Sequence, residues 1–143
     1  MEYDRMLAGL FEEEDRARDM AWKLIGLAEQ SREAATLERD SLLAFLQGPM
    51  ERHFTYEETA VFPHLEEHGL SEEVQVACKQ HAAIREAAQE LAAAPQDEDV
   101  AHVIVRVAKL MLHHTNFEGD YIYPELTHEE WRELMKATVR QGA

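Results

Sequence analysis

Apolar residues recur at spacings of three and four along most of the chain, the pattern of helices that bury one face. Glycine and proline are sparse, and good helix formers such as alanine, leucine and glutamate are abundant. The pattern is interrupted at residues 30–36, 63–70, 94–97 and 124–126, and Gly48-Pro49 predicts a kink within the second segment. Four long helices and one short one remain.

Polar residues that favour helix starts support these divisions. Ser71 and Asp97 each precede acidic residues that suit the positive end of a helix dipole, and Thr127 begins the capping-box sequence Thr-His-Glu-Glu. Because the turns are short, successive helices should run antiparallel. We therefore predict an all-α fold, an antiparallel up-down-up-down four-helix bundle with a short fifth C-terminal helix. A single domain is expected over residues 1–143, with the bundle at about 1–124 and the last helix at about 127–140.

Each long helix carries an apolar seam, and each seam is interrupted by side chains that can bind metal. In the fourth helix, for example, the seam runs through Val107 and Met111 before it reaches a histidine and a glutamate one turn apart. The second helix contains the same pair of residue types. The interruptions are Glu14 in the first helix, His53 and Glu57 in the second, His81 in the third, and His114 and Glu118 in the fourth.

Six such groups in buried seams need a common partner. Burial without one costs several kcal/mol for each carboxylate, against a net stability of only ~5–15 kcal/mol for a small domain. A histidine and a glutamate four residues apart lie about 6 Å apart on one helix face, so two such pairs on two helices can hold two ions. Three nitrogen and three oxygen ligands suit a dinuclear transition-metal site, with iron preferred and manganese or zinc as alternatives.

Two of these positions have competitors. A neighbouring register of the first helix places Glu13 rather than Glu14 in the seam, and the acidic run around both residues ordinarily faces water. His113 also has usable spacing to Glu118, although it points about 100° away from His114. The seam register favours His114. The remaining histidines lie near helix ends or on polar faces and are expected to be solvated: His64, His68, His102 and His128.

The net charge and the cysteine content indicate which classes of binding partner and which cellular location to expect. Twenty-nine acidic against fourteen basic residues give a formal net charge of -15, and no basic patch offsets it, so nucleic acid and anionic lipid are not expected as partners. No segment is long and apolar enough to span a bilayer, and the first thirty residues lack the pattern of a signal peptide. The single cysteine, Cys78, suits a reducing compartment, so the cytoplasm is the expected location.

Two segments of the chain repeat one motif. HFTYEETAVFP (53–63) and HTNFEGDYIYP (114–124) both have a histidine, a glutamate four residues later, and an aromatic residue followed by proline at the end. Together with Lys79-Gln80-His81, they make the chain resemble the hemerythrin-like, or HHE cation-binding, domain family from the first helix through Pro124. The resemblance implies an antiparallel four-helix bundle around a non-haem di-iron centre. Its implied ligands are His53, Glu57, His81, His114 and Glu118.

The chain departs from the O2-carrying pattern of that family in two places. The first helix of such a carrier supplies a histidine, but no histidine precedes His53 here, and Glu14 is the substitute. Arg85 stands where the third helix often supplies a second histidine. Carboxylates stabilise higher-valent iron, whereas neutral imidazoles favour the reduced ion. The replacement of histidines by Glu14 and Arg85 argues against simple O2 storage. The resulting site resembles the carboxylate-rich di-iron sites that reduce O2 or peroxide.

We therefore expect a di-iron protein that reacts with O2, peroxide or nitric oxide. Whether it is an oxidase, a peroxidase or a detoxifying binder stays open. Four residues near the ligands are candidates for supporting roles: Tyr56, Glu58, Arg85 and Tyr121. Tyr123 is also near in sequence. Glu58 is suited to accept a hydrogen bond from a ligating imidazole, and Arg85 to offset a glutamate's charge.

Two other function classes remain open at this point. One is an iron or oxygen sensor or storage protein that acts through a partner, although sensors of this kind usually carry an appended output domain that this sequence lacks. The other is a metal-free helical interaction module, in which the histidines are incidental. Metal content separates the last class from the first two.

Overall fold

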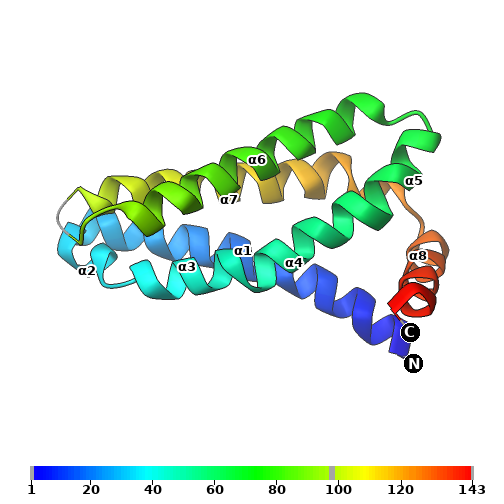
Figure 1. The fold of residues 1–143 in the computed structure, drawn as a ribbon, viewed down its shortest axis with the longest axis horizontal. Helices are drawn as coiled ribbons and strands as arrows, with labels where there is room; N and C mark the ends of the chain where they lie inside the picture. The colour runs from blue at the N-terminus through cyan, green and yellow to red at the C-terminus, as the bar shows by residue number, and fades with distance from the viewer. Residues whose placement is uncertain (1, 97–98, 143) are drawn as a thin grey trace.

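The computed structural model of the chain describes residues 2–96 and 99–142, and the regular structure in this part of the chain is helical throughout. Figure 1 shows four long antiparallel segments packed side by side. The second segment consists of several helices in series. The four segments are α1 (Glu2–Gln30), the series α3 (Arg39–Gln47), α4 (Pro49–Tyr56), η1 (Glu57–Val61) and α5 (Phe62–Glu67), then α6 (Ser71–Ala93), and α7 (Val100–Tyr121).

Shorter elements connect and extend these segments. The helix α2 (Arg32–Thr36) turns the chain between the first and second segments, and the 3-10 turn η2 (Tyr123–Glu125) follows α7. The last helix, α8 (His128–Gly142), packs beside the N-terminal half of α1, where it covers one end of the bundle (Figure 1). The predicted all-α bundle with a short fifth helix is confirmed. None of the described helices combines the length and the hydropathy needed to cross a membrane.

Several predicted breaks are confirmed, and two are narrower than predicted. The chain bends at Gly48, whose backbone leaves the helical region, and Pro49 begins α4. Residues 30–36 are mostly helical, because Ser31 caps α2 with a bond from the Ala34 amide of 3.1 Å. Pro63 does not end its helix, which continues to Glu67. The reason is the π-helical turn η1 just before it, whose wider backbone accommodates a proline ring that an α-helix would reject.

The ends of the helices show which local signals set them. Thr127 and Glu130 form the predicted capping box, with bonds of 3.1 and 3.2 Å between each side chain and the other's amide. Gly69, with φ of 88°, ends α5 by a Schellman motif in which the Leu70 amide reaches the Leu65 carbonyl. Ser71 begins α6 but does not cap it with its side chain. The start signal predicted at Asp97 lies outside the described residues.

The apolar core is divided into two clusters along the bundle axis. One cluster lies toward α2 and α3 and includes Leu24, Phe45 and Ile104. The other lies toward α8 and includes Phe62 and Trp131. Each long segment passes from one cluster to the other through a short buried stretch that is polar, and the candidate site lies in this polar layer.

Candidate metal centre

All six side chains predicted to bind metal meet in the polar layer. None of them is more than 4% exposed. The helical spacing explains why each points inward: one turn on either side of the layer, the same helix face carries core residues such as Leu10 and Ala17 on α1. The six residues are Glu14 on α1, His53 on α4, Glu57 in η1, His81 on α6, and His114 and Glu118 on α7.

The six residues form two overlapping groups, each with the size of a metal site. Glu57, His81, His114 and Glu118 form the first group, and Glu14 and His53 join the same two glutamates in the second. Within each group, one ligand atom from every residue lies within 4.8 Å of the others. Because Glu57 and Glu118 belong to both groups, the two groups share two carboxylates.

Individual distances show how closely the groups are assembled. His81 Nε2 lies 3.2 Å from Glu57 Oε1 and 3.7 Å from Glu118 Oε1, and His114 Nε2 is in close contact with Glu118. In the other group, His53 Nε2 lies 2.7 Å from Glu14 Oε1 and 3.6 Å from Glu57 Oε1. The inner nitrogen of every histidine is therefore Nε2, and each faces at least one carboxylate oxygen.

Several of these inner atoms lack a hydrogen bond, although they are buried. Within the described part of the chain, no hydrogen bond reaches Glu57 Oε1, His81 Nε2, His114 Nε2 or either carboxylate oxygen of Glu118. An unsatisfied buried polar group costs about 1–3 kcal/mol, and more when charged. Their concentration at one point, with donor types that borderline transition metals accept, fits a bound metal ion.

The outer nitrogen of two histidines is held by a hydrogen bond. His81 Nδ1 lies 2.8 Å from Glu58 Oε2, and His114 Nδ1 lies 2.7 Å from Gln80 Oε1. Since these oxygens only accept, each Nδ1 carries the proton and each Nε2 has its lone pair free for a metal. His53 Nδ1 faces Glu13 at the longer distance of 3.9 Å. This arrangement of an inner ligand atom and an outer acceptor is typical of metal-binding histidines.

Arg85 acts on the site through Glu58. Its guanidinium group donates to both Glu58 oxygens, at 2.8 and 3.1 Å, and also to Glu51. It lies over the ring of Phe54, which stacks on His81 with 3.9 Å between ring centroids. Arg85 therefore offsets the charge of Glu58, and Phe54 fixes the plane of the His81 ring.

Burial and neighbouring charges shift the pKa values of five of the six residues. Burial raises the pKa of Glu57 and of Glu118 well above the usual range. The charge of Glu118 raises the pKa of Glu57 further, and the charge of Glu14 raises that of Glu118, whereas a hydrogen bond with Glu57 lowers the pKa of Glu118. Burial lowers the pKa of His81 to about 2 and that of His114 to about 4, so both are neutral at pH 7. Burial also opposes a charge on His53, but Glu13 and Glu14 outweigh it and raise its pKa to about 10. A bound cation would take the place of these protons.

Comparison with known protein families identifies the family of the domain. The hemerythrin HHE cation binding domain matches residues 5–126, which is most of the chain. The chain belongs to the hemerythrin family. No curated protein and no solved structure matches it. The buried cluster of histidines and glutamates thus lies in a domain of a cation-binding family and fits a metal site.

Of the three tyrosines that the sequence places near the ligands, Tyr123 is the one whose hydroxyl lies at the cluster in this hemerythrin domain. The Tyr123 hydroxyl, which comes from η2, lies 3.0–3.2 Å from Glu14 Oε1, His53 Nε2 and Glu57 Oε2. Tyr121 is 55% exposed, and Tyr56 directs its hydroxyl to Met135 Sδ at 3.5 Å. The proline after Tyr123 and the 3-10 turn around it fold this residue back onto the site, which helical periodicity alone does not indicate.

The competing ligands lie outside both groups. His113 is exposed on α7, and the Glu13 side chain is 31% exposed at the edge of the cluster. Gln80 has a role that the sequence reasoning missed, although it stands beside His81 in the motif. The sequence feature that could have indicated this role is the position of Gln80, a polar residue directly before the buried His81.

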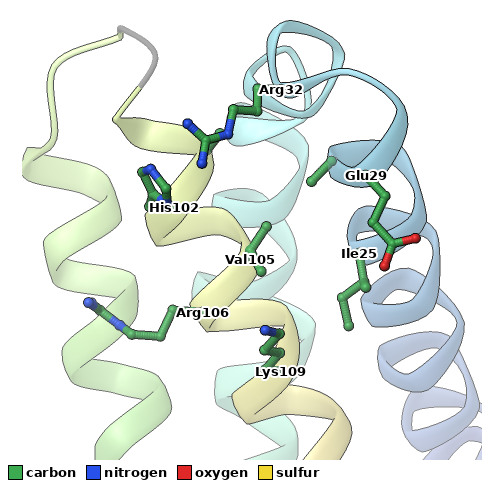
Figure 2. Close-up of a pocket in the computed structure, with 9 residues that line it drawn as sticks. Ile25, Glu29, Arg32, His102, Val105, Arg106 and Lys109 are labelled. Carbon is green, nitrogen blue, oxygen red and sulfur yellow. The ribbon is translucent and has the colours of Figure 1, made fainter.

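Cavities in the hemerythrin domain lie around the cluster rather than in it. A cavity of about 450 Å³ lies between α1, α2 and α7, and none of the six residues lines it. Figure 2 shows Arg32, Arg106 and Lys109 among the residues that line it. A smaller groove of about 220 Å³ between α1, α4 and α8 does reach the cluster, because His53 forms part of its wall. The other residues of this groove are Gly9, Leu10, Glu13, Arg52, Tyr56 and Met135.

Proposed function

We propose that the protein binds two iron ions in the buried cluster, with Glu14, His53, Glu57, His81, His114 and Glu118 as ligands. The observation that carries the proposal is the sharing of Glu57 and Glu118 by both groups of ligand atoms. Glutamate can bridge two ions, and imidazole with carboxylate suits iron, with manganese or zinc as alternatives.

We further propose that the site reacts with O2, peroxide or nitric oxide and does not simply carry O2. Bound iron would supply the electrons and an open coordination position for the small ligand. The chain supplies an oxygen-rich environment, because Glu14 replaces the histidine that the first helix of an O2 carrier provides. Carboxylate donors favour the oxidised metal, which supports redox turnover or detoxification over reversible carriage.

Tyr123 is the proton donor in this proposal. Burial raises the pKa of its phenol well above the usual range, and the adjacent carboxylates of Glu57 and Glu14 raise it further, so the hydroxyl keeps its proton at neutral pH. That proton lies within hydrogen-bond distance of Glu14 and Glu57. A small ligand that arrives through the groove beside His53 would lie near this donor, because the Tyr123 hydroxyl is 3.0 Å from His53 Nε2.

Metal analysis of protein produced with iron, combined with its visible spectrum, tests the proposal. We expect about two irons per chain and absorption bands from oxygen-to-iron charge transfer. Reduction followed by addition of peroxide, O2 or nitric oxide then separates turnover from reversible binding. Colourless, metal-free protein of undiminished stability would support a helical interaction module instead.

A sensor or storage role through a partner is the second candidate. The buried His114 Nε2 and Glu118 oxygens, which accept no hydrogen bond, favour it, because a fold that buries such atoms without partners depends on a bound metal. Partner binding that differs between iron-loaded and iron-free protein would support it. The cytoplasmic location stays a prediction based on the single cysteine.

A further inference from the structure

A third group of metal-capable side chains lies on the surface, away from the buried cluster. His64 is on α5, His68 follows the end of that helix, and Glu130 is in the first turn of α8. One ligand atom from each lies within 4.8 Å of the other two. The group brings together two elements that are far apart in the sequence, which explains why each histidine, taken alone, was expected to be merely solvated.

The two histidines present their rings side by side. They are four residues apart at the end of α5, and their ring centroids are 4.3 Å apart. His68 Nδ1 lies 2.8 Å from the His64 carbonyl oxygen. Because a carbonyl can only accept, Nδ1 carries the proton, and His68 Nε2 has its lone pair free for a metal ion.

Glu130 is held in place by the capping box of α8. Its Oε1 accepts from the Thr127 amide at 3.2 Å, while its Oε2 lies 3.2 Å from His64 Nε2. The Oε2 atom of Glu130 and the Nε2 atom of His64 thus face each other within the group.

We propose that His64, His68 and Glu130 bind one divalent transition-metal ion, of which zinc is the best match, and that the ion joins α5 to α8. Two imidazole nitrogens and one carboxylate oxygen form a ligand set that zinc accepts, with a fourth position open to water. The site is partly exposed, with side-chain exposure of 27% at His64 and 36% at Glu130, so its ion exchanges with solution. It is independent of the iron proposed for the interior.

The position of α8 gives this site a consequence for the rest of the molecule. Trp131 follows Glu130 directly, and its ring packs against Tyr123 and Phe11, with centroid distances of 5.2 and 5.8 Å. Met135 on the same helix lines the groove that reaches His53. An ion that ties the start of α8 to α5 therefore strengthens the cover over this end of the bundle.

Calorimetric titration of the iron-loaded full chain with Zn²⁺ tests the proposal. We expect one Zn²⁺ per chain, with affinity reduced at least about tenfold in His68→Ala and in Glu130→Gln. Glutamine still completes a capping box, so Glu130→Gln should keep α8 folded. His102→Ala is the matched control, since it removes an exposed histidine outside the group. Equal binding in all four proteins, or none in the parent, would overturn the proposal.

A second readout ties the ion to α8. Cu²⁺ bound beside Glu130 should quench the fluorescence of Trp131 in a Trp22→Phe background, where the other tryptophan is absent. The quenching should require His68 and Glu130, while the iron content of every variant stays that of the parent. Quenching that persists in His68→Ala and Glu130→Gln would place the ion elsewhere. A variant that loses iron but still shows the quenching would contradict the proposal for the buried cluster and not the proposal for the surface site.

Discussion

The three buried histidines show how single side chains are prepared for a metal. His81 is the best-held example, because Phe54 stacks on its ring, Glu58 accepts from its Nδ1, and Arg85 fixes Glu58. Its Nε2 can then point only into the cluster. Residues that never touch the metal thus set the orientation of the residues proposed to bind it.

Glu58→Ala should weaken iron binding while the fold remains intact. His81 loses its outer acceptor, and a change of this kind typically lowers metal affinity about 10–100-fold. Competition with a chelator measures the affinity. Glu51→Ala is the control, because Glu51 also pairs with Arg85 but is not a partner of His81. Equal affinities in the two variants would show that the contact from Glu58 to His81 has no part in metal binding.

Glu14→Ala should lower the iron content from about two ions per chain toward about one. Glu14 belongs only to the group that contains His53, so the group of His81 and His114 keeps all four of its residues. Metal analysis of purified protein provides the measurement. Glu12→Ala removes an exposed carboxylate from the same helix and should change nothing. Two irons retained in Glu14→Ala would remove Glu14 from the ligand set.

Tyr123→Phe should leave the iron content unchanged but slow the reaction with peroxide by about 100-fold, the usual contribution of a positioned proton donor. Stopped-flow absorbance follows the reaction. Tyr121→Phe is the matched control, since that hydroxyl belongs to a side chain that is 55% exposed. If both variants react at the parent rate, Tyr123 is not the donor.

At the scale of the elements, two backbone features place the site on the second segment. The π-helical turn η1 contains Glu57 and carries the helix past Pro63, and Gly69 then ends α5 sharply enough for α6 to return beside it. The first feature aims Glu57 and Glu58 to opposite sides of His81, with Glu57 at its Nε2 and Glu58 at its Nδ1. The second brings His81 back to the level of His53.

Gly69→Ala should destabilise the protein by about 1 kcal/mol, because a Cβ is unfavourable at a φ of 88°. Gly26→Ala provides the opposite case. Gly26 lies inside α1, and no atom lies within 4 Å of the place its Cβ would take, so the free energy of unfolding should rise by up to about 1 kcal/mol. Urea denaturation measures both. A stabilising Gly69→Ala would contradict the Schellman ending of α5.

For the whole molecule, the buried polar layer links stability to the metal. Two apolar clusters enclose a stretch with three glutamates and three histidines, none of them more than 4% exposed. Without a cation, the layer is neutralised only by protons. The metal-free protein should therefore be less stable than the metal-loaded protein, and it should depend more strongly on pH.

The sign of that pH dependence follows from His53, Glu57 and Glu118, whose pKa values in the folded, metal-free protein all lie above their unfolded values. Each contributes stability that is complete below its unfolded pKa and is lost as pH rises toward its folded pKa, about 10 for His53. The free energy of unfolding with chelator should therefore fall between pH 7 and 10. The metal-loaded protein should change less, and parallel curves for both forms would contradict the prediction.

Much of this molecule was predictable from local patterns in the sequence. The all-α bundle, the short last helix, the bend at Gly48 and the capping box at Thr127 all depend on spacings within one helix or one turn. The same spacings pointed Glu14, His53 and His81 inward, and the structure brings them together with the other three residues. Their role as metal ligands stays a prediction.

Only the tertiary structure decided which residues of neighbouring helices lie opposite one another along the bundle axis. Periodicity determines the face on which a residue lies, but not how far one helix slides along or turns about its neighbour, because that depends on packing between distant segments. For this reason the sequence left Glu13 and Glu14 as competitors, missed Gln80, and did not distinguish Tyr123 from Tyr121. The surface group of His64, His68 and Glu130 has the same origin, since it exists only where α8 packs against the end of α5.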